Sequence, residues 1–354
     1  MILTIFIVVA LPGSVYSTPL LSISSSYIGE PLSDITISRL LNHAAQYMSA
    51  EPHPLSRLHT EGTLPHQGIW DESVLAKRDF PLMRDAALAW KLSGDRRYLQ
   101  QVDTFLYAWT NTYLLSYNPI DETNFDALIQ AYMLTEELLS PKTQESVQIF
   151  LRKMAEGYLT RMHLHQDESK TAKSFTWINN WQSHRIKLLT LSAVALKDPA
   201  LIDQAHQLFL QQIADNIQPD GSVADFKDRD ALHYVVYDLE PLIMAAMAAR
   251  CFNNKNDWLH EKSATHTTLA NAIDWLIPYA DGTKTHEEFV HSHVAFDKKR
   301  ADAGVHGFAG IWDPRTAASL FALAAQLDAK YHPLAEKLAT AAPPSIHKPT
   351  KETP

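Results

Sequence analysis

The chain has 354 residues, of which 46% are hydrophobic and 20% charged, and its formal net charge is −9. Nucleic acid is excluded as the expected partner, because proteins that bind it usually display a basic surface. An anionic sugar is not excluded, since a cleft can be locally positive inside an acidic protein. Cys251 is the only cysteine, which rules out an intramolecular disulfide, so stability must come from a large hydrophobic core. The composition is typical of a compact helical domain.

The two ends of the chain differ in composition from the rest. Residues 1–13 are apolar apart from Thr4, and small residues follow up to Ser17, which predicts a signal peptide over residues 1–17 and a periplasmic or secreted protein. This run is shorter than the roughly 20 residues that span a bilayer, and no later segment reaches that length, so we expect no membrane span. We expect one domain over residues 18–340, acting as a monomer, and a flexible tail over residues 341–354.

Helical hairpins recur along the chain. Each has a helix rich in small residues, a turn rich in Asp, Asn or Gly, and often a second, amphipathic helix. The first helices cover residues 86–92, 189–196, 244–251 and 319–327, and second helices follow at residues 98–109, 201–213 and 334–338. Self-similar units of this size indicate stacked helix pairs. They can form an open solenoid that binds a protein or a closed ring with a central cleft. The alanine-rich first helices favour the ring, an all-α fold called the α/α toroid.

A polar cluster precedes the helix pattern that begins near Ile186. It reads Asn179-Asn180-Trp181-Gln182-Ser183-His184. One asparagine can serve as a helix cap, but Asn180 and His184 are four residues apart and share a helix face, which presents an amide and an imidazole together. Trp181 and the preceding Trp177 are either platforms for sugar rings or core residues. Lys173 lies in a basic segment just before the cluster and could contact an anionic sugar.

A second cluster follows the turn Pro219-Asp220-Gly221-Ser222. The helix pattern here begins near Asp228, which places Arg229, His233 and Tyr237 at i, i+4 and i+8 on one stripe. The alternative to a functional site is a core network in which every polar group is hydrogen-bonded. Tyr234 lies beside this stripe and is the second candidate for a catalytic tyrosine.

These residues resemble the alginate lyase family of polysaccharide lyases. The resemblance covers about residues 81–325. It rests on Asn179-Asn180 at a helix start, on Asp220-Gly221, and on Arg229 followed by the pattern Ala231-Leu232-x-Tyr234-x-x-Tyr237-x-Leu239-x-Pro241-Leu242. The segments 118–124 and 284–286 to 312–314 extend it. Members of the family have an α/α toroid fold and cleave uronic-acid polymers by β-elimination, so the resemblance implies a lyase.

The resemblance also implies roles for single residues. Asn180 matches the family's asparagine that neutralises the substrate carboxylate. Arg229 matches the family's arginine, and Tyr237 matches its catalytic tyrosine. Where the family has a histidine after the second asparagine, this chain has Trp181, and His184 is the expected substitute. Asn179, His233 and Tyr234 are expected to bind substrate. The substrate is expected to be an anionic polysaccharide, either alginate or glucuronan.

These residue types suit elimination beside a carboxylate. Removing the C5 proton of a uronate is difficult while its carboxylate carries full charge, and amide, imidazole and guanidinium groups stabilise the charge that develops. Tyr237 could move both protons if they lie on one side of the sugar, and otherwise His184 would act at C5. An adjacent arginine would favour the phenolate of the tyrosine.

Three other interpretations compete with this one. The run from His286 to His291 is one residue too long for a zinc-protease motif, so we expect no metal, and the scheme needs no cofactor. A glycoside hydrolase on the same fold would use a carboxylate pair such as Glu122 and Asp225. A catalytically silent polysaccharide-binding protein is the remaining alternative.

Overall fold

A computed structural model describes residues 34–168 and 175–341. The predicted signal peptide and residues 342–354 of the predicted tail lie outside these ranges. The described residues form helices and no strand, and their only β pairings are the isolated bridges Ile217 to Val223 and Glu287 to Ile311. No helix within the described ranges is both long and apolar enough to cross a membrane. The prediction of an all-α fold is confirmed.

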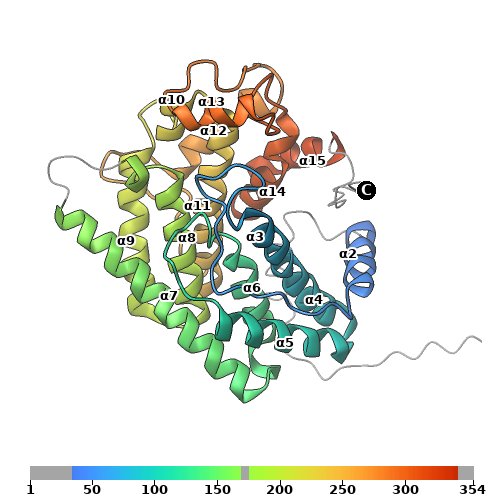
Figure 1. Cartoon of the computed structure of the whole chain (residues 1–354). Helices are drawn as coiled ribbons and strands as arrows, with labels where there is room; N and C mark the ends of the chain where they lie inside the picture. Colours follow the sequence, from blue (N-terminus) through green and yellow to red (C-terminus); the bar gives the residue numbers. More distant parts are fainter. Residues whose placement is uncertain (1–33, 169–174, 342–354) are drawn as a thin grey trace, which may run out of the picture.

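The helices form two layers (Figure 1). The inner helices contact one another in series and are α4 (Asp79–Ser93), α6 (Phe125–Thr135), α8 (Asn180–Ala195), α11 (Leu232–Phe252) and α14 (Ala318–Leu327). The outer helices pack against them and are α5 (Arg96–Thr112), α7 (Pro141–Glu168), α9 (Pro199–Asn216), α12 (Leu269–Ala280) and α15 (His332–Ala341). This arrangement of hairpins is the predicted α/α toroid.

Shorter helices lie beside these layers. They are α2 (Asp34–Gln46), α3 (Trp70–Lys77), α10 (Ala224–Arg229) and α13 (Ala295–Asp302), together with the 3-10 turns Glu136–Leu138, Phe175–Trp177, Pro314–Ala317 and Ala329–Tyr331. Helices α10, α12 and α13 gather at one end of α8 and α11, at the top of Figure 1. The chain between α2 and α3 passes near the same end. Segments far apart in sequence therefore meet there.

The predicted turns are present and are built by capping residues. Gly94 ends α4 in the left-handed conformation (φ 70°), and its amide binds the Trp90 carbonyl at 2.8 Å. A residue with a side chain would be strained at this φ. Asp95 and Asp198 then cap α5 and α9, each through a carboxylate oxygen that accepts a backbone N–H. These local signals are what made the hairpins visible in the sequence.

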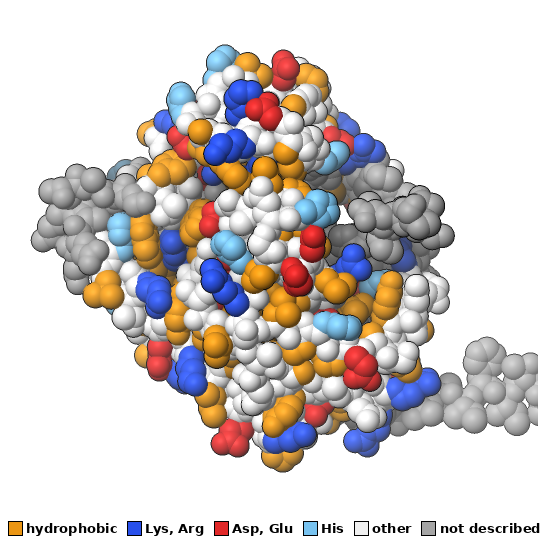
Figure 2. Space-filling model, viewed as in Figure 1, with side chains coloured by type: hydrophobic (Ala, Val, Ile, Leu, Met, Phe, Trp, Pro, Cys, Tyr) orange, Lys and Arg blue, Asp and Glu red, His pale blue; other side chains and the backbone are white. Residues whose placement is uncertain are grey.

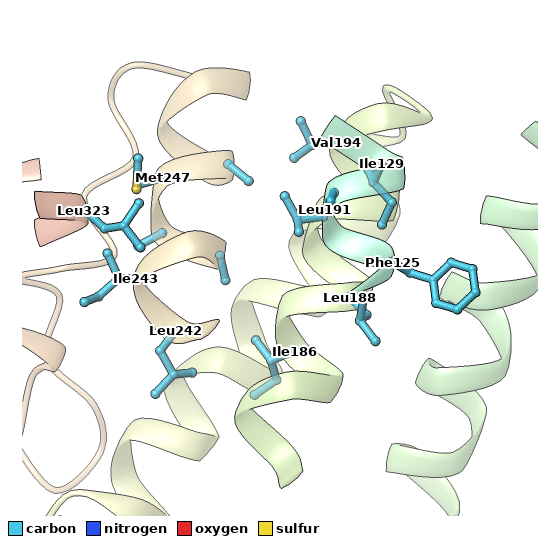
Figure 3. Packing of buried hydrophobic residues seen from close by; sticks show 14 of the residues in the cluster. Phe125, Ile129, Ile186, Leu188, Leu191, Val194, Leu242, Ile243, Met247 and Leu323 are labelled. Atoms are coloured by element: carbon cyan, nitrogen blue, oxygen red, sulfur yellow. The ribbon is translucent and has the colours of Figure 1, made fainter. Parts of the chain in front are cut away.

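Helix α8 lies between α6 and α11, and Figure 3 shows the side chains that join the three. Leu191 and Val194 of α8 lie beside the α6 ribbon that carries Ile129, and Ile186 of α8 lies on the side of Leu242 of α11. All five side chains are buried. Burial of each contributes roughly 1.5–3 kcal/mol, so this packing fixes α8 and α11 relative to each other.

Helix α8 is buried on all sides, and only Trp181 is partly exposed along its length. Its polar side chains therefore need partners inside the protein. Ser183 donates to Asp238 at 2.6 Å, and Arg185 donates to the Thr176 carbonyl at 2.7 Å. Among the described residues, Ser192 Oγ of this helix has no hydrogen-bond partner.

The helix predicted to carry Arg229, His233 and Tyr237 together is interrupted, so that prediction is wrong for Arg229. Helix α10 ends at Arg229, Asp230 adopts a left-handed conformation (φ 50°), and α11 begins at Leu232. Asp230 is held in this conformation by the segment from His286 to His291. Its carboxylate accepts from the His291 amide at 2.9 Å, and its carbonyl accepts from the Phe289 amide at 2.8 Å. His233 and Tyr237 remain on one face of α11.

Candidate active site

A pocket of about 240 Å³ opens where the N-terminal end of α11 meets α13 and the chain before α3. Its lining residues come from four separate stretches of sequence. They are Thr60, Thr63, Leu64, Pro65 and Trp70, then Ile120, then His233, Tyr234 and Tyr237, and finally Arg300, Val305 and Phe308. Apolar walls with a few converging polar groups are typical of a small-molecule or sugar site.

The first wall is the loop at residues 60–65, and the buried Asp121 holds it in place. The backbone amides of Thr60 and Glu61 both donate to Asp121 Oδ1, at 2.7 and 3.0 Å. The other carboxylate oxygen lies 2.9 Å from His59 Nδ1. Lys77 Nζ also donates to Thr60 Oγ1 at 2.8 Å. A carboxylate that accepts several backbone N–H groups fixes a loop strongly, so this wall is preorganised.

The second wall is the first two turns of α11, which present His233 and Tyr237 to the pocket four residues apart. Burial, together with the charges of Arg300 and Arg229, lowers the pKa of His233 to about 4. Burial raises the pKa of Tyr237. Arg300 lowers the Tyr237 pKa as expected of a nearby arginine, but burial has the larger effect. At neutral pH the imidazole is therefore an unprotonated base and the phenol an intact acid.

Arg300 and Phe308 form the third wall. Arg300 lies on α13, and its Nη1 donates to the Tyr234 hydroxyl at 2.9 Å. Its guanidinium carbon lies 4.9 Å from the centre of the Phe308 ring. The side chain of Arg300 keeps 20% of its surface exposed. This arginine was missed in the sequence because it belongs to the charged run of α13, which is typical of a solvated helix.

The two asparagines of the first cluster have structural contacts. Asn179 caps α8 through a hydrogen bond from the Trp181 amide at 3.1 Å. Asn180 directs its side-chain amide at Asp225, at 3.0 and 2.9 Å from the two carboxylate oxygens, and its backbone amide binds the same group at 2.7 Å. Neither asparagine lines the pocket. Asn179 therefore caps α8, and Asn180 fixes the start of α8 to α10.

Arg229 also lies outside the pocket lining. Its Nη1 donates to the buried Asp297 at 2.5 Å, and its Nε lies 3.5 Å from Asp225. The guanidinium stacks on the Tyr234 ring, with 3.9 Å between its carbon and the ring centre. Because two buried carboxylates flank this cation, its charge is already compensated inside the protein.

His184 packs against the catalytic candidate Tyr237, with 4.4 Å between the ring centres, and does not itself line the pocket. Its Nδ1 lies 2.8 Å from Thr123 Oγ1. Burial and the nearby Lys187 hold the pKa of His184 well below its usual range, so the ring is neutral. His184 of α8 and Tyr237 of α11 are thus in contact, and His184 supports Tyr237 from outside the pocket.

The tautomer of His184 follows from the partners of Thr123. Lys187 Nζ has three hydrogens and three acceptors, namely the Thr123 carbonyl, Thr123 Oγ1 and Asp126. Thr123 Oγ1 therefore accepts from Lys187, and its own hydrogen is available for His184 Nδ1. The proton of the neutral ring then lies on Nε2. The Tyr237 carbonyl, which loses its usual helical donor because residue 241 is proline, opposes the effect of burial on the His184 pKa.

Replacing Thr123 tests this arrangement. Thr123→Val removes the hydroxyl and leaves both His184 Nδ1 and one Lys187 hydrogen without a partner, so we expect the free energy of unfolding to fall by about 1–3 kcal/mol. Thr123→Ser keeps the hydroxyl and should lose less than about 1 kcal/mol. Nitrogen-15 NMR of the histidines should show a proton on Nε2 of His184 in the wild-type protein. A proton on Nδ1 would contradict the assignment.

The other predicted substrate-binding residues lie elsewhere. The Trp177 ring is stacked on the His165 ring, with 4.3 Å between the ring centres. The guanidinium carbon of Arg185, a residue of α8, lies 3.7 Å from the centre of the Trp177 ring. Trp181 is half-buried at the start of α8, and neither tryptophan lines the pocket. Lys173 lies outside the described residues. Of the predicted set, the pocket brings together His233, Tyr234 and Tyr237.

Glu122 is buried in a network of donors and does not line the pocket. One carboxylate oxygen accepts from the Ser116 and Tyr117 amides at 2.6 and 3.0 Å, and the other accepts from the Tyr158 hydroxyl at 2.5 Å. Asp225 is similarly occupied by Asn180. Both carboxylates that a hydrolase would need therefore accept hydrogen bonds from other segments of the protein.

The histidines of the segment from His286 to His291 bind Asp230. His291 Nδ1 lies 2.8 Å from its carboxylate, and His286 Nε2 lies 2.9 Å from its carbonyl. No group of three or more His, Cys, Asp or Glu side chains suited to a metal ion occurs within residues 34–168 and 175–341. On the face drawn in Figure 2, acidic and basic side chains are interspersed.

Comparison with known sequences identifies the family. The family model described as "Alginate lyase" matches residues 23–286, which is more than half of the chain. The chain belongs to the alginate lyase family. A curated relative from Stenotrophomonas maltophilia (strain K279a), described as "Polysaccharide lyase", is 28% identical over 150 residues, which span 42% of this chain and 42% of the relative.

Solved structures of alginate lyases share this fold. An alginate lyase from Bacteroides ovatus superposes with a TM-score of 0.62 and 17% identity, over 91% of this chain and 94% of that one. Alginate lyase A1-III from Sphingomonas species A1 gives a TM-score of 0.51 and 15% identity, over 77% and 82% of the two chains. A histidine-to-alanine variant of alginate lyase A1-III complexed with a tetrasaccharide gives a TM-score of 0.53 and 18% identity, over 84% and 93%. The alginate lyase family and the α/α toroid predicted from the sequence are therefore confirmed.

Proposed function

We propose that this protein is a polysaccharide lyase that cleaves a 1,4-linked uronic-acid polymer by β-elimination. Alginate is the leading substrate and glucuronan the second. The observation that carries the proposal is one pocket lined by an unprotonated imidazole, an intact phenol and a guanidinium, from His233, Tyr237 and Arg300. The family membership supports it, as do the curated relative named as a polysaccharide lyase and the fold shared with alginate lyases complexed with a tetrasaccharide.

The pKa values of the two pocket groups suggest how the protons move. Two groups whose pKa values are shifted apart in one site are natural partners as acid and base. His233 would take the C5 proton, the electrons of the C5–H bond would form the C4=C5 double bond, and the C4–O4 bond would break. Tyr237 would give its proton to the leaving O4. The products are an unsaturated uronate end and a free hydroxyl.

A single-residue route remains open, in which Tyr237 both takes the C5 proton and protonates O4. His233→Gln separates the two routes. It should reduce the rate about 10²-fold or more if His233 is the base, and much less if Tyr237 acts alone. The proposal gives the role of the imidazole to His233, which lines the pocket, in place of His184, which does not.

The pH dependence of kcat/KM should reflect these two groups. His233 must be unprotonated, and its pKa is about 4, so activity should be nearly constant near neutral pH and fall about tenfold per unit below that pKa. Tyr237 must be protonated, and its raised pKa moves the alkaline fall above pH about 10. An acid fall centred near pH 6.5 would contradict the assignment of a buried, neutral His233.

The hydrolase alternative is weakened by the occupied carboxylates of Glu122 and Asp225. Incubating the purified protein with alginate, glucuronan and a neutral glucan, while following the ultraviolet absorbance of unsaturated ends, tests the proposal. Absorbance should rise with a uronan and stay flat with the glucan. Cleavage without absorbance would favour a hydrolase. Binding without cleavage would favour the catalytically silent alternative.

We further propose that the protein acts in the periplasm or outside the cell as a monomer. The apolar start of the chain, residues 1–13, supports the location. Cell fractionation and the solution mass by light scattering test the two statements.

A further inference from the structure

We infer that Arg300, rather than Arg229, is the cation that binds the substrate carboxylate. This rests on the proposed function and names the specificity residue of the same pocket. Of the two arginines, Arg300 lines the pocket and Arg229 does not. The resemblance matched the family's arginine to Arg229, which precedes the candidate catalytic tyrosine Tyr237 in sequence. The break in the helix at Asp230 separates it from that face.

The charges around the two arginines differ. Arg229 is bonded to Asp297 at 2.5 Å and has Asp225 at 3.5 Å from its Nε. Arg300 Nη1 is 3.8 Å from the same Asp297, beyond hydrogen-bond range. Asp297 is in addition occupied by the Ser292 hydroxyl at 2.8 Å. Arg300 is therefore the cation of this pair whose charge is less compensated.

The donors of Arg300 are also available. In the described ranges, its guanidinium makes one hydrogen bond, from Nη1 to the Tyr234 hydroxyl. Arginine carries five N–H donors in a planar fork that matches a carboxylate. Its ring contacts to Phe296 and Phe308, at 4.4 and 4.9 Å, hold the plane without using those donors. A uronate carboxylate can thus be bound through the remaining edge.

The surroundings would strengthen such a contact. Apolar lining residues, among them Leu64, Val305 and Phe308, lower the local dielectric, in which charge-assisted hydrogen bonds are stronger. His233 and Tyr237 line the same pocket. A carboxylate held by Arg300 would bring C5, to which it is attached, into the pocket that holds the proposed base and acid.

Neutralising Arg300 tests the inference. Arg300→Gln should lower kcat/KM on the free-acid uronan by about 10²-fold or more, the size expected for loss of a charged donor at developing charge. Arg300→Lys keeps the charge but loses the planar fork of donors. Its kcat/KM should therefore lie between those of the wild type and Arg300→Gln. Lys299→Gln is the matched control, because it removes the same charge from the neighbouring exposed position of α13 and should stay within about twofold of wild type.

The methyl ester of the same uronan separates carboxylate binding from a structural effect. Esterification removes the charge that Arg300 would bind, so Arg300→Gln and Arg300→Lys should differ from wild type by less than about threefold on the ester. The inference would be overturned if Arg300→Gln lost kcat/KM equally on the acid and on the ester, or if it kept wild-type activity on the free acid. Either result would leave the lyase proposal intact. Absence of unsaturated product from any uronan with the wild-type protein would instead overturn the proposed function.

Discussion

Tyr237→Phe should abolish polymer cleavage, with a fall in kcat of about 10³-fold or more, while the protein stays folded. The substitution removes only the hydroxyl, and a general acid contributes roughly 10²–10⁴-fold to a proton-transfer step. The ring contact with His184 at 4.4 Å is kept, so the packing between α8 and α11 should not change.

Steady-state rates with a uronan, together with circular dichroism of the same samples, measure this. Tyr234→Phe is the matched control, because it removes a neighbouring pocket hydroxyl. That hydroxyl accepts from Arg300 at 2.9 Å, so its loss should disturb the arginine and cost about tenfold. If Tyr237→Phe kept wild-type activity and Tyr234→Phe lost it, the roles of the two tyrosines would be exchanged.

Asp225→Ala should lower the free energy of unfolding by about 3–5 kcal/mol, because removing one partner of a buried charged network leaves the others uncompensated. Asp225 is fully buried. It accepts three hydrogen bonds from Asn180, at 2.7, 3.0 and 2.9 Å, and lies 3.5 Å from Arg229 Nε. Its loss would free the start of α8 from α10.

Urea unfolding measures the effect, and Asp302→Ala is the control. Asp302 pairs with Lys298 at 2.8 Å on the exposed surface of α13, where an i, i+4 ion pair contributes about 0.5 kcal/mol or less. A stable Asp225→Ala protein that had lost only its activity would contradict the structural role. That result would instead support Asp225 as a member of the catalytic carboxylate pair of a hydrolase.

The fold could be predicted because its signals are local. The turn at Gly94 and Asp95 uses residues whose conformational and capping preferences depend on few neighbours. The alanines of the first helices similarly indicated the crowded inner layer, since Ala86, Ala87 and Ala89 of α4 are all fully or almost fully buried. Repetition of one such unit was enough to predict stacked pairs.

The site was only partly predictable because it depends on long-range contacts. The spacing of His233 and Tyr237 placed both on one helix face, and both line the pocket. The helix break at Asp230 is imposed by the distant segment 286–291, which helical periodicity does not show. Arg300 lies in an ordinary charged run, and nothing in that run indicates that the fold brings it to Tyr234.

Asn180 and Arg229 show that a sequence motif does not reveal which contacts its residues make. The resemblance assigned Asn180 to the carboxylate and matched Arg229 to the family's arginine, yet Asn180 binds Asp225 and Arg229 binds Asp297. The same residue types suit a catalytic site and a buried ion network, because both require charged and amide groups with fixed partners. Only the contacts distinguish the two uses.

The central claim is that the protein cleaves the polysaccharide by elimination, so that no water molecule is added across the cleaved linkage. Digesting a uronan briefly in water enriched in oxygen-18, reducing the new sugar ends at once so that their hemiacetal oxygen does not exchange with the water, and measuring the masses of the oligosaccharides tests this most directly. The account predicts that each cut gives one fragment with an unsaturated end, lighter by one water molecule than a saturated oligosaccharide, with no heavy oxygen at the cleaved linkage. Saturated fragments that carry one heavy oxygen per cut would contradict it.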